Sequence, residues 1–553
     1  MKALRYFSIL IVIHLTSCSD LDPASLVEAP PHLITSETLY KDMAGFEAGL
    51  NGLYSLLRDE RTGGNDFMLA NMMVGTDNMV TNYTYLGFEH IAQDWGNINN
   101  PNHLQYLRQF TFLYKVINTA NTIINRAENA QINWTGGGSS PEQNKNRVVA
   151  EARAIRAWAY RHLTYGWGDV PISTEESSST TIRTDWERTP VAQVRNLMLE
   201  DWEFAEQHIA SEPSQSGRIT KGAVQTFLSE LYLTLNNPER ALFWANKAIE
   251  DPAYSLITSR YGTKQGEPGV PFMDMFTEGN ENRHQGNKEA LWVWNYALNV
   301  PGGSYHNLNF FHNGRYFAMQ INGVTPFQLT VERGGRGVAR MSMTKWALEL
   351  YEPQDDRGSD FAIRKYFVFK DAQQNAPFPA DILPPGYSYG DTILLDQTND
   401  ITPGTTLRVD WPYSRKAEAG SNPSDLAGGN RYNDFVYLRL AETYLLKAEA
   451  QLLMGDRAGA AQTLNIVRKR SNVSEITADD VTLDFILDER SRELVLEEDR
   501  RWTLLRTGKW LERTRKYNKN GGQLVAEKDQ LFPIPQAVID ANLTQTMPQN
   551  PGY

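Results

Sequence analysis

Two stretches of the chain, far apart in sequence, carry the same pattern of two amphipathic segments separated by a helix-breaking turn. In the first stretch, Phe227 and Leu231 lie at helical spacing before a break at residues 236–238, and alanines recur at helical spacing across residues 241–248. Small residues at this spacing let two helices approach closely. The pattern therefore predicts a helical hairpin, and it constrains the fold to one built by packing helices.

The second stretch has an apolar stripe across residues 438–452, and small and apolar residues continue at helical spacing across residues 460–467. Between the two, Gly455 is placed to end one helix and Asp456 to cap the next. Aligning the two stretches places Ala241 on Ala460 and puts both breaks at the same position, which is weak internal repetition. Both hairpins resemble tetratricopeptide repeats.

Long stretches without a regular pattern separate the helices. Loops of this length on a compact scaffold are usually functional or disordered, and the aromatic residues in several of them argue against disorder. We therefore expect a mainly α fold, a tetratricopeptide-like hairpin scaffold with long irregular loops and insertions. The irregular stretches are residues 135–141, 175–181, 261–288 and most of 371–432.

The single cysteine, Cys18, follows a short apolar run at residues 6–15, with Lys2 and Arg5 before it. This arrangement is typical of a signal peptide, and the run has about half of the ~20 apolar residues that a membrane-spanning helix needs. The order Leu-Thr-Ser-Cys resembles the bacterial lipobox. We therefore expect removal of residues 1–17 and acylation of Cys18, which would hold the protein on a membrane. An ordinary signal peptide that contains a cysteine by chance is the alternative.

The formal net charge of −12 argues against nucleic acid or an anionic lipid surface as the main partner, because both need a basic face. With one cysteine in the chain, no disulfide and no thiolate metal site is expected, and we expect no cofactor. Residues 18–35 combine acidic residues and prolines, as an extended tether does. We expect an N-terminal helical region at 36–260 and a C-terminal region with long loops at 261–553, packed together as one globular unit.

Two further stretches predict helices. Residues 151–165 are alanine-rich and amphipathic and are followed by Gly166, Gly168 and Pro171. Residues 483–510 form a strongly charged helical stretch, whose charges we expect on a solvated face. Its candidate buried positions are Phe485, Leu494, Leu496, Trp502 and Leu505.

Four segments, in this order, resemble the SusD/RagB family of outer-membrane lipoproteins from Bacteroidetes. They are EARAIRAWAYRHLTYGWGDVPI at 151–172, YLRLAETYLLKAEAQLLMGD at 437–456, ERSRELVLEEDRRWTLLRTGKW at 489–510, and the tail LFPIPQAVID followed by QNPGY. The resemblance implies a mostly helical lipoprotein whose loops capture a glycan and hand it to a SusC-like TonB-dependent transporter. The acidic stretch at 19–22 resembles the signal that sends such lipoproteins to the cell exterior.

A glycan site needs aromatic rings that lie against the apolar faces of sugars, with planar polar groups beside them. The segment at 75–101 has this composition and includes Tyr83. In family members that bind starch, an Asp, a Trp and an Asn of the corresponding segment contact the sugar. By order and spacing, the resemblance implies these roles for Asp77, Trp95 and Asn100. A structural Trp95 beneath a loop is the alternative.

A second aromatic cluster, at residues 294–317, places Tyr305 directly after a Pro-Gly-Gly turn. A glycine-rich turn that presents rings suits a binding loop, so we expect Tyr305 to contact the ligand. Alternating aromatics also suit a buried strand, and we expect Trp292 and Trp294 in the core.

Motifs for catalysis are absent from the sequence. It has no His-Glu-x-x-His and no Gly-x-Ser-x-Gly, and residues 334–337 lack the Lys and Ser of a phosphate loop. A glycosidase needs only two carboxylates, which no spacing excludes. The acids at 497–499 are consecutive, so we expect them to cap a helix and pair with Arg500 and Arg501. We therefore expect glycan binding without catalysis. A peptide-binding uptake lipoprotein of the same family and a surface glycoside hydrolase are the alternatives.

Overall fold

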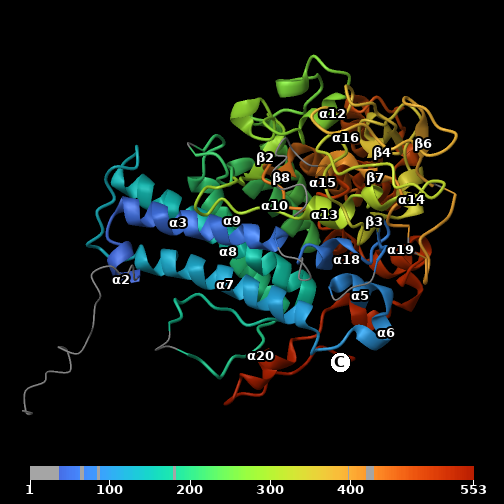
Figure 1. Cartoon of the computed structure of the whole chain (residues 1–553). Coiled ribbons are helices and arrows are strands. Elements are labelled where there is room, and N and C mark those ends of the chain that lie inside the picture. The colour runs from blue at the N-terminus through green and yellow to red at the C-terminus, as the bar shows by residue number, and fades with distance from the viewer. Residues whose placement is uncertain are drawn as a thin grey trace, which may run out of the picture.

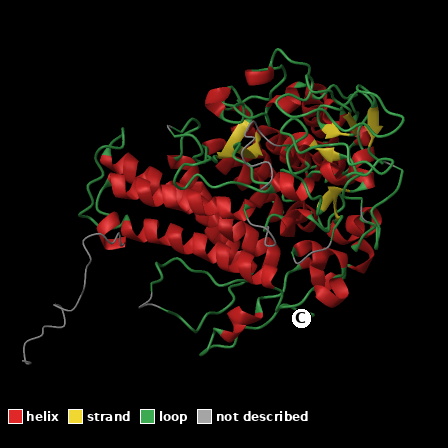
Figure 2. Cartoon of the chain, viewed as in Figure 1, coloured by secondary structure: helices red, strands yellow, loops and turns green. Residues whose placement is uncertain are grey.

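The computed structural model describes residues 36–62, 68–83, 87–178, 182–213, 215–396, 398–405, 407–418 and 429–553. Long helices form one half of the molecule, and loops with short strands fill much of the other half (Figure 1, Figure 2). The mainly α fold predicted from the sequence is therefore confirmed. The long N-terminal helices are α3 (Met43–Leu57), α7 (Leu104–Arg126), α8 (Pro141–Trp167) and α9 (Val191–His208).

The first predicted hairpin is formed by α10 (Lys221–Thr234) and α11 (Pro238–Glu250). The side chains of Thr220 and Asn237 cap these helices, each accepting a hydrogen bond from the backbone N–H three residues along, at 3.2 and 3.1 Å. Pro238 occupies the first turn of α11, where its missing N–H costs nothing. The alanines of α11 are buried: Ala241, Ala245 and Ala248. Ala241 packs with Leu233 of α10 and with Leu446.

The second predicted hairpin is formed by α15 (Leu440–Leu453) and α16 (Arg457–Arg470). Gly455 ends the first helix with a φ of 83°, and the Asp456 carboxylate caps the second by accepting from the Gly459 N–H at 2.8 Å. Leu438, at the start of the predicted apolar stripe, belongs instead to the strand that leads into α15.

The two hairpins pack against each other through α11 and α15. The hydroxyl groups of Thr226 and Thr443 lie 2.7 Å apart in the buried contact between α10 and α15. One hydrophobic cluster also runs through both predicted regions and includes Phe46, Trp292 and Phe532. The boundary between the two regions at residue 260 stays a prediction.

Short two-stranded antiparallel ladders tie the loops together in the described part of the chain. The central ladder, β2 with β8, is buried on every residue, and Trp292 and Trp294 lie in the core as predicted. The ladders are β1 (Met79–Thr81) with β3 (Met341–Met343), β2 (Ala290–Trp294) with β8 (Phe435–Arg439), β4 (Ile363–Arg364) with β7 (Tyr413–Ser414), and β5 (Tyr366–Val368) with β6 (Thr392–Leu394).

The charged stretch at 483–510 is not one helix with a solvated face, so this prediction was wrong. It contains α17 (Leu483–Leu494) and α18 (Arg500–Arg506) and ends at the start of α19 (Trp510–Tyr517). The chain turns sharply after α17, where Leu496 has a φ of 66°. Glu489, Glu493 and Arg500 are at most 1 % exposed. Of the predicted buried positions, Leu494, Leu496 and Trp502 are buried, and Phe485 and Leu505 are partly buried.

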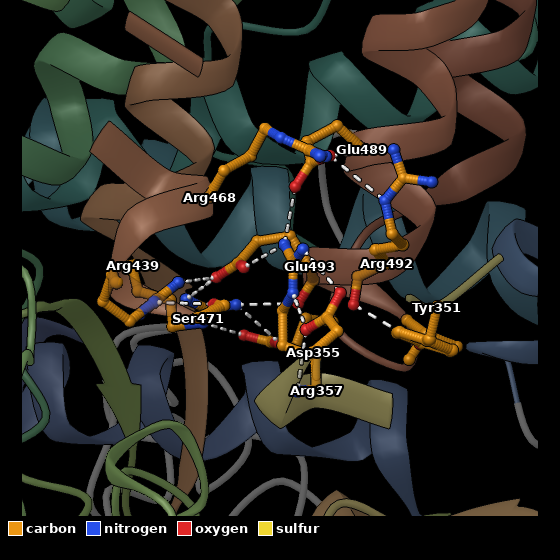
Figure 3. Close-up of polar contacts among 12 residues, drawn as sticks. Tyr351, Asp355, Arg357, Arg439, Arg468, Ser471, Glu489, Arg492 and Glu493 are labelled. Carbon is orange, nitrogen blue, oxygen red and sulfur yellow. Dashed lines mark hydrogen bonds and ion pairs between the residues drawn. The ribbon is translucent and has the colours of Figure 1, made fainter. Parts of the chain in front are cut away.

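The buried charged side chains of α17 form a network of ion pairs with arginines from other parts of the chain (Figure 3). The Glu493 carboxylate accepts hydrogen bonds from the guanidinium groups of Arg357, Arg439 and Arg470, at 3.0 and 2.7 Å for the first two. Burial alone would raise the pKa of Glu493, but the arginines outweigh burial and hold that pKa well below its usual range. The network joins α17 to β8, to the second hairpin and to the loop around residue 357.

Glu489 lies one helical turn before Glu493 and extends the network. Its carboxylate accepts from Arg357 at 2.7 Å, and from Arg468 and Arg492 at 2.8 Å. Burial opposes ionisation, yet these arginines lower the pKa of Glu489 to about 2. Removing one member of such a network would leave uncompensated buried charge, so its role is structural.

The consecutive acids at 497–499 point in different directions, as expected of neighbours on a turn. Glu497 pairs with Lys416 and Arg439, Glu498 with Arg490 and Arg500, and Asp499 with Arg161. The predicted pairing with Arg500 is thus confirmed for Glu498. The guanidinium group of Arg501 instead lies 4.1 Å from the ring centroid of Trp510.

Candidate functional site

Asp77 is a structural residue, which corrects its predicted role as a sugar contact. Its side chain is fully buried just before β1. The carboxylate accepts two hydrogen bonds from Arg500, at 2.8 and 2.7 Å, and one from Arg513 at 2.7 Å. Burial alone would raise the pKa of Asp77, but the two arginines lower it, so the carboxylate is charged and paired. It fastens the early segment to α18 and α19.

Trp95 is a core residue, so its predicted role in stacking on sugar was wrong. Its side chain has no exposed surface, and its ring meets those of Phe88 and Trp510 edge to face at 5.6 and 5.5 Å. Gly75 lies against the ring with a φ of 73°, and a Cβ atom there would come within 3.0 Å of it. The alternative of a structural tryptophan under a loop therefore describes this residue.

Asn100 shapes the turn that leads into α7. Its amide nitrogen donates to the backbone oxygen of Ile98 at 2.9 Å, and its amide oxygen accepts from the backbone N–H of Asn102 at 3.0 Å. The side chain is half-buried. Because its polar atoms already bond the backbone, the structure gives Asn100 a turn-forming role, and its contact with a sugar stays a prediction.

Tyr83 lies half-buried directly after β1 and is covered by a guanidinium group. The Arg408 guanidinium carbon lies 3.8 Å from the centroid of its ring, a cation–π contact. A hydrogen bond between the neighbouring residues brings Arg408 close to Tyr83, because the Leu407 N–H donates to the side chain of Asn82 at 2.9 Å. Arg408 also donates to the backbone oxygen of Val338 at 2.7 Å.

Tyr305 is also half-buried, and its ring centroid lies 6.3 Å from that of Tyr432. Hydrogen bonds to the backbone link the chain that follows Tyr305 to the residues around Tyr83. Phe310 follows in the chain, and its backbone oxygen accepts from the Val338 N–H at 2.7 Å. Val338 in turn accepts from Arg408, which covers Tyr83. We call this half-buried set the tyrosine surface: Tyr83, Tyr305, Phe310, Arg408 and Tyr432.

The tyrosine surface combines the two kinds of group that recognise sugars, partly exposed rings and a planar polar group. Phe310, Arg408 and Tyr432 were not among the predicted site residues. No local pattern marks Arg408, because the contact that places it joins residues 82 and 407. Cys18 lies outside the described residues.

Two kinds of feature are absent from the described part of the chain. No group of three or more His, Cys, Asp or Glu side chains there could hold a metal ion. None of the helices in the same ranges is both long and apolar enough to cross a membrane.

The fold and the candidate site together define a class of protein: a scaffold of helical hairpins that carries large loops with partly exposed aromatic rings. Two family models match the chain: the one described as SusD family covers residues 288–553, and the one described as starch-binding associating with outer membrane covers residues 36–233. The chain belongs to the SusD/RagB family.

Individual relatives align with this chain over nearly its whole length. SusD-like protein P2 of Formosa agariphila is 23% identical over 591 aligned residues, covering 100% of each chain. A structure of a laminarin binding SusD-like protein matches with a TM-score of 0.68 at 21% identity, over 93% of this chain and 100% of that one. Surface glycan-binding protein A from Bacteroides thetaiotaomicron, solved with laminarihexaose, matches with a TM-score of 0.66 at 21% identity, over 92% and 100%.

Proposed function

We propose that this chain is a cell-surface lipoprotein of the outer membrane that binds an oligo- or polysaccharide and delivers it to a SusC-like TonB-dependent transporter. Cys18 carries the lipid, the chain faces the cell exterior, and binding proceeds without chemistry on the glycan. The observation that carries the proposal is the match, over nearly the full length, to relatives whose names record laminarin and surface glycan binding.

The tyrosine surface supports the proposal because its partly exposed rings are ones that the fold does not need for its core. Tyr83 and Tyr305 keep part of their rings accessible, whereas Asp77 and Trp95 are committed to the interior. Tyrosine presents an apolar face and a polar tip, which suits sugars with apolar C–H faces and hydroxyl edges.

Replacing Tyr83 or Tyr305 with alanine is expected to weaken glycan binding roughly three- to tenfold each, since an aromatic contact contributes about 0.5–1.5 kcal/mol beyond its buried area. Affinity electrophoresis in gels containing laminarin, soluble starch or alginate measures the effect. Tyr389→Ala is the matched control, because Tyr389 is 45 % exposed and lies outside the tyrosine surface.

Three outcomes would contradict the proposal. Failure of the unmodified protein to bind any of the three glycans would oppose glycan binding. If Tyr83→Ala and Tyr389→Ala reduce glycan affinity equally, the tyrosine surface is not the binding site. Shortened glycan after incubation, seen by chromatography, would indicate hydrolysis rather than capture.

Replacing Cys18 with alanine is expected to release the protein from the membrane fraction, because the acyl chains would be its membrane attachment. Cell fractionation followed by immunoblotting measures the distribution. The released protein should still bind glycan, which serves as the control for folding. A Cys18→Ala protein that still sediments with membranes would show that the attachment is not a lipid on this residue.

A further inference from the structure

A cleft of about 970 Å³ lies between two of the long loops, and none of the tyrosine-surface residues lines it. One wall is formed by residues 260–278, which include α12 (Pro271–Asp274) at the top of the view in Figure 1. The other wall includes Phe361 and residues 374–378. The volume lies at the upper end of the range for small-molecule sites, about 300–1,000 Å³.

The first wall is held in shape by one arginine. The Nε of Arg260 donates to Asp274 at 2.7 Å, and its other two nitrogens donate to the backbone oxygens of Glu267 and Lys264 at 2.7 and 2.6 Å. Gly269 makes room for this guanidinium group, because a Cβ atom there would come within 2.7 Å of it. The loop is thus folded around the Arg260 guanidinium group, so its backbone loses little conformational entropy when a ligand binds.

The second wall is fastened to the interior. Arg333 and Asp381 form a buried ion pair with a nitrogen–oxygen distance of 2.5 Å. Arg333 also donates to the side chain of Asn375, whose amide nitrogen donates to the backbone oxygen of Pro379. Asn375 is itself a lining residue. Both walls are therefore built before any ligand arrives.

The charges around the cleft compensate one another. Arg260 pairs with Asp274 at 2.7 Å, and Arg415 pairs with Glu418 at 2.9 Å. Glu332 pairs with a lysine, Lys370, at 3.0 Å. The lining as a whole holds four cationic and five anionic side chains, so its charges nearly balance and a strongly charged ligand gains little from it. The open edges of paired carboxylates and guanidinium groups can still bind hydroxyl groups.

Apolar rings complete the lining. Phe361 is 40 % exposed and Phe378 is half-buried, so each keeps part of a ring accessible. Partly exposed rings beside fixed planar polar groups are the arrangement that neutral sugars require. We propose that this cleft is a second glycan-binding site, which takes a segment of a neutral oligosaccharide. The inference rests on the proposed glycan-binding function.

Phe361→Ala tests the inference in the full mature protein, with Phe243→Ala as a matched control at 41 % exposure on α11. We expect Phe361→Ala to weaken binding of laminarin, or of soluble starch if that is the glycan bound, roughly three- to tenfold. Phe243→Ala should change binding by less than twofold. Hydrogen exchange should also show that the bound glycan protects backbone amides at 260–278 and 374–378, and that Phe361→Ala reduces this protection.

The outcomes separate this inference from the proposed function. If Tyr83→Ala weakens binding while Phe361→Ala does not, and the glycan leaves the cleft unprotected, the second site is overturned and glycan binding stands. Stronger protection of the cleft by alginate, an anionic glycan, than by the neutral glycans would overturn the neutral ligand class. If the unmodified protein binds none of the three, both proposals fail.

Discussion

Replacing Glu493 with alanine is expected to lower the free energy of unfolding by about 3–5 kcal/mol, or to prevent folding altogether. The Glu493 carboxylate has no exposed surface and pairs with Arg357, Arg439 and Arg470. Without it, these guanidinium groups lose a shared counter-charge in a place that water does not reach. Urea unfolding followed by circular dichroism measures the change.

Glu512→Ala is the control for this experiment. Glu512 pairs with Lys509 at 2.9 Å, but its side chain is 61% exposed, so the pair contributes only about 0–1 kcal/mol. A loss for Glu493→Ala no larger than that of the control would mean that the buried network is not what holds α17 in place.

Trp95→Ala is expected to lower the free energy of unfolding by about 3–5 kcal/mol, because it removes a large core side chain and leaves a cavity. The ring is fully buried between Phe88 and Trp510, and the Arg501 guanidinium carbon lies 5.3 Å from its centroid. Denaturant unfolding measures this loss. Glycan affinity, measured on the fraction that remains folded, should be unchanged.

Leu543→Ala provides the matched comparison, since Leu543 is 77 % exposed and its truncation leaves no cavity. A variant Trp95→Ala that keeps its stability but loses glycan binding would restore this ring to the binding site and contradict the assignment to the core.

Local sequence patterns were sufficient to predict the two helical hairpins. Caps, glycine stops and alanine spacing act between residues a few positions apart, so the break at 236–238 and the roles of Gly455 and Asp456 could be predicted from the sequence. The family blocks also predicted the helical class. Each of these features depends on neighbours in the chain, and none depends on a distant partner.

The roles of Asp77 and of the charged residues of α17 depend on distant partners, which is why they could not be predicted in the same way. Asp77 looked like a polar loop residue, but its partner Arg500 lies 423 positions along the chain. The charges of α17 looked solvated because the sequence does not show that Arg357 and Arg439 meet them in the interior. A charged helix face indicates solvent only when no opposite charges fold onto it.

The contact between the hairpins has a consequence for the order of folding. The hydroxyl pair of Thr226 and Thr443 joins residues 217 positions apart in the sequence. The chain must therefore close a long loop before α15 can pack on α10. Contacts of such sequence separation form slowly, because the chain loses entropy before it gains stabilisation. Until then the apolar side chains Leu233 and Ala241, which pack with Leu446 of α15, stay exposed. We therefore expect a chain in which this contact has not formed to be prone to aggregation.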